Sequence, residues 1–227
     1  MIRDNLRAVE ERISSVCKRL GRNPQEIVLI GVTKYADIAQ IKEALQAGLT
    51  HIAENKVQQA QERLPALDGV IPSLTKHMIG HLQSNKAKQA LQLFDLIHSV
   101  DSLKLAQEID KQAQKLNKEA QILVQVNTSG EKSKSGAESA QAVSLVQQIS
   151  VLPHVKALGL MTMAPLTEDQ NIVRQAFREL KKIFDQIATM SLSRVEMRYL
   201  SMGMSQDYEI ALEEGANMIR IGSAIFK

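Results

Sequence analysis

A lysine at the end of a buried strand is the residue of this chain best suited to chemistry. Lys34 directly follows Ile27–Thr33, whose apolar and β-branched side chains predict a strand buried on both faces. The carboxyl ends of such strands are where α/β proteins bind their ligands. A deprotonated lysine amine can also form a Schiff base with an aldehyde. Taken alone, such a lysine is more often a solvated side chain, so its interpretation depends on its neighbours.

Small and hydroxyl-bearing residues follow the last two strands that the sequence predicts. Ser201, Met202 and Gly203 end one of these strands, and Gly222 and Ser223 end the other. Glycine lets the backbone approach an oxyanion closely, and serine adds a hydrogen-bond donor. Each serine alone is more simply a helix cap. As a pair on adjacent strands, opposite a strand-end lysine, they predict a phosphate site.

Three further polar side chains in or near predicted strands need an explanation. Arg220 interrupts an apolar strand, so we expect it either to pair with a carboxylate such as Glu54 or Glu196 or to donate to a ligand. His77 and His81 lack the spacing of metal ligands and are predicted to be hydrogen-bonded structural histidines.

The charged segment 132–136 fits a phosphate clamp and a surface loop equally well. No Ser/His/Asp or Cys/His pattern suggests a hydrolase.

The elements that position these residues alternate regularly along the chain. Residues 2–20 form an amphipathic helical pattern that ends at Gly21, and short apolar strands then alternate with helical patterns. The predicted strands are Ile27–Thr33, His51–Glu54, Lys76–Ile79, Leu96–Val100, Ile122–Val126, Ala157–Met161, Glu196–Leu200 and Met218–Ile221. This alternation predicts an α/β fold, a single-domain (β/α)8 barrel over residues 1–227 with an extra N-terminal helix. An open doubly wound sheet is the alternative.

Composition narrows the class of protein. The net charge of +3 and the 3% aromatic content, with no tryptophan, argue against nucleic-acid binding. Cys17 is the only cysteine, which excludes a disulfide framework. The charged amino terminus does not resemble a secretory signal, and no apolar run approaches membrane-spanning length. We therefore expect a cytoplasmic protein with no membrane or metal partner.

The motifs together resemble those of the pyridoxal-phosphate homeostasis proteins, which share the barrel of the alanine racemase N-terminal domain, a fold-type III barrel that binds pyridoxal 5′-phosphate (PLP). The matching segments span nearly the whole chain in the family's order. They are Val32-Thr33-Lys34, AENKVQ from Ala53, IGHLQSNK from Ile79, HSVDS from His98, SKSG from Ser133, GLMTMAP from Gly159, LSMGMSQDYE from Leu200 and RIGSAIF from Arg220.

The resemblance implies a role for each candidate side chain. Lys34 corresponds to the lysine that forms the internal aldimine with PLP, Asn55 lies beside the ring, and Arg220 faces the pyridine nitrogen. The phosphate is held by the two strand-end groups described above, namely Ser201, Met202, Gly203, Gly222 and Ser223.

The same resemblance favours a binding protein over an enzyme. An arginine at the pyridine nitrogen disfavours its protonation and makes the ring a weaker electron sink. The racemase-type enzymes also carry a β-domain, with the opposing catalytic tyrosine, that this sequence does not contain. We expect a monomer that takes part in PLP homeostasis and hands the cofactor to apo PLP-dependent enzymes.

Three alternatives stay open at this stage. The first is a small PLP-dependent amino-acid racemase or lyase. The others are a cofactor-free Schiff-base aldolase and an interaction protein with a vestigial pocket.

Overall fold

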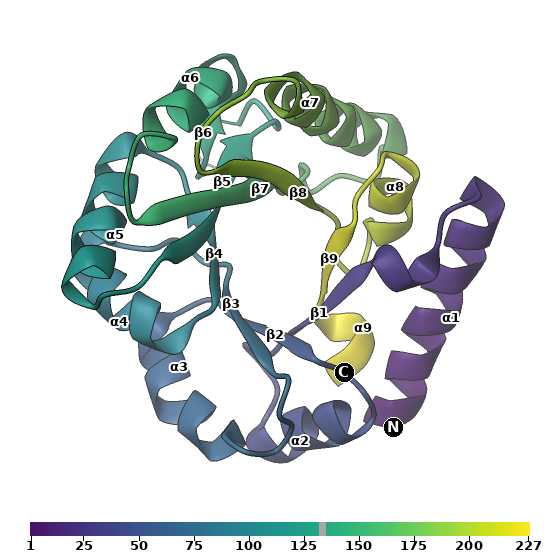
Figure 1. Cartoon of the computed structure of the whole chain (residues 1–227). Helices are drawn as coiled ribbons and strands as arrows, with labels where there is room; N and C mark the ends of the chain where they lie inside the picture. Colours follow the sequence, from purple (N-terminus) through teal and green to yellow (C-terminus); the bar gives the residue numbers. More distant parts are fainter. Residues whose placement is uncertain (132–134) are drawn as a thin grey trace.

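The strands of this chain form a closed parallel barrel. A computed structural model describes residues 1–131 and 135–227, and Figure 1 views it along the barrel axis. The ring consists of β1 (Val28–Val32), β2 (His51–Glu54), β3 (Thr75–Met78), β4 (Leu96–Val100), β5 (Ala120–Asn127), β7 (Val155–Met161), β8 (Val195–Ser201) and β9 (Met218–Ile221).

Pairing of the first and last strands closes the ring. Ile30 of β1 is in register with His51 of β2 on one side and with Arg220 of β9 on the other. On the far side of the ring, β4 pairs with β5 and β5 pairs with β7, all in parallel. Each strand of the ring therefore has two neighbours, which excludes the open sheet and confirms the predicted (β/α)8 barrel.

Helices surround the barrel on its outside (Figure 1). They are α1 (Ile2–Leu20), α2 (Ile38–Gln46), α3 (Val57–Arg63), α4 (Ala87–Leu93), α5 (Leu103–Lys115), α6 (Ser139–Ile149), α7 (Gln170–Ala188), α8 (Tyr208–Glu213) and α9 (Ser223–Phe226). Short 3₁₀ helices cover Pro24–Glu26, Leu64–Leu67 and Ser84–Lys86. Within the described ranges, none of the helices has the length and apolar content needed to cross a membrane.

Two apolar clusters fill the structure. The larger one lies between the strands and the helices and includes the buried face of α1, with Leu6, Val16 and Cys17. The smaller one is contributed by strand residues such as Ile30, Leu123 and Leu158, and it fills the barrel interior. Alternation of side chains along each strand separates the two clusters.

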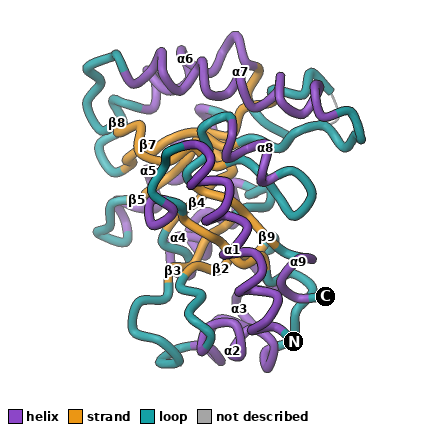
Figure 2. Tube along the Cα trace, turned by 90° about the vertical axis from the view of Figure 1, so that its right-hand side faces the viewer, coloured by secondary structure: helices purple, strands orange, loops and turns teal. Residues whose placement is uncertain are grey.

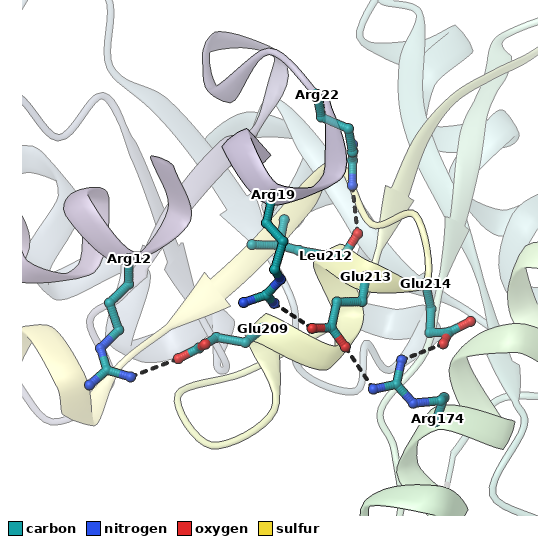
Figure 3. Close-up of polar contacts among 8 residues, drawn as sticks. All are labelled: Arg12, Arg19, Arg22, Arg174, Glu209, Leu212, Glu213 and Glu214. Atoms are coloured by element: carbon teal, nitrogen blue, oxygen red, sulfur yellow. Dashed lines mark hydrogen bonds and ion pairs between the residues drawn. The ribbon is translucent and has the colours of Figure 1, made fainter. Parts of the chain in front are cut away.

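Polar contacts hold the predicted extra helix α1 and the residues just after it against α8. Helix α7 contacts α8 from the other side (Figure 3). The guanidinium of Arg22 donates to the carbonyl oxygens of Leu212 and Ala216, at 2.7 Å each. Ion pairs complete the contact: Arg12–Glu209, Arg19–Glu213, Arg174–Glu213 and Arg174–Glu214. Because α8 follows the loop after β8, these contacts hold one wall of the cavity described below.

The two ends of the described chain lie side by side, next to α9, as both Figure 1 and Figure 2 show. The side-chain amide of Asn5 in α1 donates to the carbonyl oxygens of Ile225 and Lys227, at 3.0 and 3.2 Å. The first helix thus braces the last one.

The structure differs from the sequence prediction mainly in strand bounds. β5 and β7 each begin two residues earlier than expected, and β5 also extends one residue further. One additional strand, β6 (Ala137–Glu138), pairs in parallel with the end of β5 outside the ring. A two-residue strand has too little pattern to be read from a sequence.

Candidate functional site

A cavity of about 930 Å³ lies at the carboxyl ends of β1, β7, β8 and β9. Four of the eight predicted site residues line it, namely Lys34, Arg220, Gly222 and Ser223. Its wall also contains Ser205 and Asp207, from the loop between β8 and α8. A concave site of this size, with few polar groups that converge, is typical of a small-molecule pocket.

Lys34 enters this cavity from a rigid support. The residue before it, Thr33, is fully buried. The backbone N–H of Thr33 donates to the carbonyl oxygen of Ala53 at 3.0 Å, and its hydroxyl oxygen lies 3.0 Å from the same carbonyl oxygen. Its hydroxyl also lies 2.7 Å from Glu54 Oε1. Lys34 itself is half-buried, and its Nζ lies 4.8 Å from the ring centroid of the exposed Tyr35. The backbone that presents the amine is therefore fixed, while the amine itself can be reached.

Glu54, which supports Thr33, is itself a buried carboxylate that is 1% exposed. Arg63 pairs with Glu54 Oε1 at 3.0 Å and also donates to the carbonyl oxygens of Thr33 and Ala36. Burial raises the pKa of Glu54, while the hydrogen bond from Thr33 and the charge of Arg63 lower it. This group fixes the chain on both sides of Lys34.

Arg220 projects from β9 and is almost completely buried, at 3% exposure. Its guanidinium donates to Ser201 Oγ at 2.7 Å and to the carbonyl oxygen of Thr162 at 2.8 Å. Burial lowers the pKa of Arg220 to about 10, against the opposing effect of Asp207, so the side chain stays cationic at neutral pH. Of the carboxylates that the sequence suggested as partners, Glu54 binds Arg63 and Glu196 binds Lys156. That part of the prediction is wrong, and Arg220 uses a hydroxyl and a backbone carbonyl instead.

The loops after β8 and β9 meet in the cavity wall. Ser205 Oγ accepts hydrogen bonds from the backbone N–H groups of Gly222, at 3.2 Å, and Ala224, at 3.4 Å. The Met204 N–H donates to Asp207 Oδ1 at 2.5 Å, which fixes the turn that carries Ser205. Burial raises the pKa of Asp207, whereas this hydrogen bond and the charge of Arg220 lower it. Two backbone donors are thus directed to one point in the wall.

The other predicted phosphate residues lie behind the cavity rather than in its lining. Ser201 and Met202 have no exposed surface, and Ser201 Oγ is engaged by Arg220. Gly203 has a φ of 97°, and a Cβ there would lie 2.9 Å from the Cα of Tyr208. Its carbonyl oxygen accepts the N–H of Arg220 at 3.0 Å. In this structure these three residues support Arg220 and the turn.

Asn55 lies at the same level as Lys34 on the neighbouring strand end. The two residues each follow by two positions the registered pair Val32 and Ala53. Asn55 does not line the cavity, but its Oδ1 is buried and has no hydrogen-bond partner among the described residues. A buried acceptor without a partner is costly, and a ligand beside it could supply the missing donor.

Comparison with known proteins decides the family. Residues 5–227 match the model of the alanine racemase N-terminal domain. The chain is 40% identical over 223 residues to the pyridoxal phosphate homeostasis protein of Aquifex aeolicus, which covers 98% of this chain and 96% of that protein. The chain belongs to the pyridoxal phosphate homeostasis proteins.

Solved structures agree with this membership. PipY of Synechococcus elongatus is 33% identical, with full coverage of both chains. Its structure without PLP matches this one with a TM-score of 0.88, and its structure with PLP bound matches with 0.86. The fold and family expected from the sequence are therefore confirmed for this homeostasis protein.

Some residues of this homeostasis protein were not recognised as part of the site. Asp207 follows Gly203 closely, in the same polar turn as Ser205, and this clustering of polar residues after a strand could have indicated it. His51 and His98 do not line this cavity, and they were given no role from the sequence although consecutive predicted strands each contain a histidine. Residues 132–134, which include part of the SKSG segment, lie outside the described ranges.

Proposed function

We propose that this chain binds PLP in the cavity that contains Lys34 and takes part in PLP homeostasis without catalysing a reaction. The observation that carries the proposal is the presence, in one cavity, of a half-buried amine and, opposite it, of Ser205, Gly222 and Ser223. Ser205 Oγ in this wall marks the point to which the backbone N–H groups of Gly222 and Ala224 are directed. An aldehyde that also bears a phosphate needs both kinds of group. The homeostasis family and the PLP-bound PipY structure support the choice of PLP.

The donor set fits this cofactor. PLP supplies an aldehyde carbonyl and a pyridine ring that can accept electrons. Lys34 Nζ provides the amine that bonds reversibly to the aldehyde carbon, with loss of water. The N–H groups of Gly222 and Ala224, which donate to Ser205 Oγ in this structure, would donate to phosphate oxygens in its place or share them with it, and Ser223 adds a hydroxyl at the same strand end. The unpartnered Oδ1 of Asn55 fits a position beside the ring.

Arg220 supports a non-catalytic role. It stays cationic, and its guanidinium is held by Ser201 and the carbonyl oxygen of Thr162. A fixed positive charge near a pyridine nitrogen disfavours protonation of that nitrogen. A ring that stays unprotonated withdraws electrons weakly, so carbanion chemistry would be slow.

An absorption spectrum tests cofactor binding directly. We expect the purified chain, after incubation with PLP and removal of free cofactor, to absorb visible light and to lose this absorption in Lys34→Ala. Lys56→Ala, an exposed lysine after β2, is the matched control and should keep the absorption. A wild-type chain that stays colourless after loading would refute the proposal.

A PLP-dependent racemase or lyase is the second candidate. Asp207 favours it, because a carboxylate with a raised pKa in a cavity wall could act as a general base. Incubation of the loaded chain with L-alanine or L-serine separates the two functions. We expect no D-isomer and no keto acid; turnover that Lys34→Ala and Asp207→Asn both abolish would favour the enzyme.

The proposal extends to partners. We propose that the chain acts as a monomer in the cytoplasm and transfers PLP to apo enzymes that need it. Mixing the loaded chain with an apo aminotransferase should restore that enzyme's activity faster than the spontaneous release of PLP allows. Light scattering after size-exclusion chromatography gives the mass in solution, and a dimer mass would contradict the monomer.

A further inference from the structure

A chain of three histidines crosses the barrel interior and ends at Arg220. His51 Nδ1 lies 2.9 Å from His77 Nε2, and His77 Nδ1 lies 2.9 Å from His98 Nε2. His98 Nδ1 is 3.2 Å from Ser201 Oγ, the atom that accepts from Arg220 at 2.7 Å. These side chains come from β2, β3, β4, β8 and β9, so the series of hydrogen bonds links most strands of the ring.

The end of the histidine chain that lies away from Arg220 borders a second cavity. His51 and His77 line a space of about 510 Å³, together with Thr75, Asp95 and Gln121. These residues lie at or near the amino-terminal ends of their strands, except His77, which lies further along β3. The histidine chain therefore connects this second cavity with Arg220, which lies in the wall of the cavity that contains Lys34.

The histidines are hydrogen-bonding groups rather than metal ligands. Their facing ring nitrogens are already at hydrogen-bond distance from one another. The described parts of the chain contain no group of three His, Cys, Asp or Glu side chains that could hold a metal ion. Burial, and then the charge of His51, lower the pKa of His77 to about 3, and burial also holds the pKa of His98 well below its usual value. Both rings are therefore neutral, with one donor and one acceptor nitrogen each.

Arg220 determines which atom donates and which atom accepts in every hydrogen bond of the histidine chain. A guanidinium can only donate, so Ser201 Oγ accepts from Arg220. The hydroxyl hydrogen of Ser201 is then free to go to His98 Nδ1. In the reverse arrangement His98 would donate, and the buried hydroxyl would have no acceptor among its observed partners.

The same logic fixes the tautomer of each ring. His98 accepts at Nδ1 and must carry its hydrogen on Nε2, which donates to His77 Nδ1. His77 then carries its hydrogen on Nε2 and donates to His51 Nδ1. All three rings are consequently in the Nε2–H form.

We propose that His98, backed by His77, is a positioning residue for Arg220, because it holds the Ser201 hydroxyl in the orientation that accepts from the guanidinium. The carbonyl oxygen of Thr162 fixes the second nitrogen of the guanidinium. With both nitrogens engaged, Arg220 presents its charge to the cofactor cavity in one orientation. This inference deepens the proposed PLP site, although its first test needs no cofactor.

The first test is nitrogen-15 NMR of the histidine rings in the full chain without PLP. We expect His77 and His98 to show the Nε2–H tautomer at neutral pH, with the signals of His98 altered in Ser201→Ala. His154, a partly exposed histidine that is not part of the histidine chain, is the internal reference. An Nδ1–H tautomer at His98, or an average of both forms, would overturn the inference whether or not the chain binds PLP.

The second test separates positioning from packing. His98→Leu removes the acceptor of the Ser201 hydroxyl, whereas the Oδ1 of His98→Asn can replace Nδ1. We expect PLP affinity to fall roughly five- to tenfold in His98→Leu and to recover in large part in His98→Asn. The pH dependence of the bound-cofactor absorption should shift in the first variant and return in the second.

The control for this series is His154→Leu, which should change neither quantity. If His98→Leu lowers only the temperature of unfolding and leaves the affinity and the absorption profile unchanged, His98 packs the barrel and does not position Arg220.

Discussion

Ser205 and Gly222 are joined across two strand ends: the amide nitrogen of Gly222 lies 3.2 Å from Ser205 Oγ, which accepts its hydrogen. The same oxygen accepts from Ala224. A side-chain oxygen thus occupies the point to which both backbone donors are directed. In the proposed complex, a phosphate oxygen would compete for these donors or share them.

Ser205→Ala tests this relationship. Without PLP, loss of a hydroxyl that satisfies two helix-start donors should lower the free energy of unfolding by about 0.5–2 kcal/mol. Saturating PLP should reduce this difference, because phosphate oxygens can accept from the same N–H groups. Thermal unfolding with and without PLP measures both values. Ser144→Ala on the exposed face of α6 is the control, and an equal deficit in both conditions would contradict the phosphate assignment.

A pair of glycine variants separates folding from binding. Gly203→Ala should destabilise the chain by about 1–3 kcal/mol, because φ is 97° and the new Cβ would lie 2.9 Å from the Cα of Tyr208. Gly222→Ala should fold normally, since its nearest contact would be Val32 at 3.5 Å.

PLP titration completes this comparison. Gly222→Ala places a methyl group in the cavity wall, so its affinity should fall while its denaturation curve stays close to that of the wild type. Unchanged affinity would show that Gly222 does not approach the cofactor.

Arg63→Met should lower the free energy of unfolding, because it leaves the buried carboxylate of Glu54 without its charged partner. Glu54 is 1% exposed, and removal of its partner should cost about 3–5 kcal/mol of unfolding free energy. Adding Glu54→Gln to this variant should restore part of the loss, because the amide carries no charge. Urea denaturation of the single and double variants measures the difference. Equal stability of the two would mean that Arg63 acts mainly through the carbonyl oxygens of Thr33 and Ala36.

The pKa of His77 predicts a loss of stability in acid. Its pKa is lowered to about 3 in the folded chain, so between this value and 6.5 the unfolded chain binds more protons than the folded one. The contribution of His77 to stability therefore falls as the pH falls below 6.5. His77→Gln keeps a donor and an acceptor but does not titrate.

Urea denaturation at pH 7.5 and pH 5.5 checks the sign. Relative to His77→Gln, the wild type should lose about 1.4 kcal/mol between these two values. The same pH dependence in both proteins would show that His77 is not held neutral.

The site residues that the sequence could predict are those that directly follow a strand, because the ends of parallel strands meet at one side of the barrel. Lys34, Gly222 and Ser223 each follow a recognisable apolar strand, and closure of the ring puts them in one cavity. Asn55, which the family resemblance puts beside the ring, follows β2 at the level of Lys34, because neighbouring parallel strands end at the same level. The β-branched runs and the alternation with helices were sufficient for these placements.

Contacts inside the barrel could not be predicted in the same way. The partner of Arg220 at Thr162 is a backbone carbonyl, which every residue has, so no residue type indicates it. The histidine chain depends on the register of β2, β3 and β4, because a shift of one residue would direct a ring outward. The position of Ser201 behind the cavity likewise depends on which side of β8 faces the interior.

Pairing of β1 with β9 has a consequence for biosynthesis. Lys34 is translated well before Gly222 and the N–H donors beside it, because most of the barrel lies between them in the sequence. A nascent chain therefore has the amine long before it has the proposed anion-binding half of the pocket. If PLP binds as proposed, its stable capture requires β9, so a product that stops before β9 would carry the Lys34 amine without the donors that retain the phosphate.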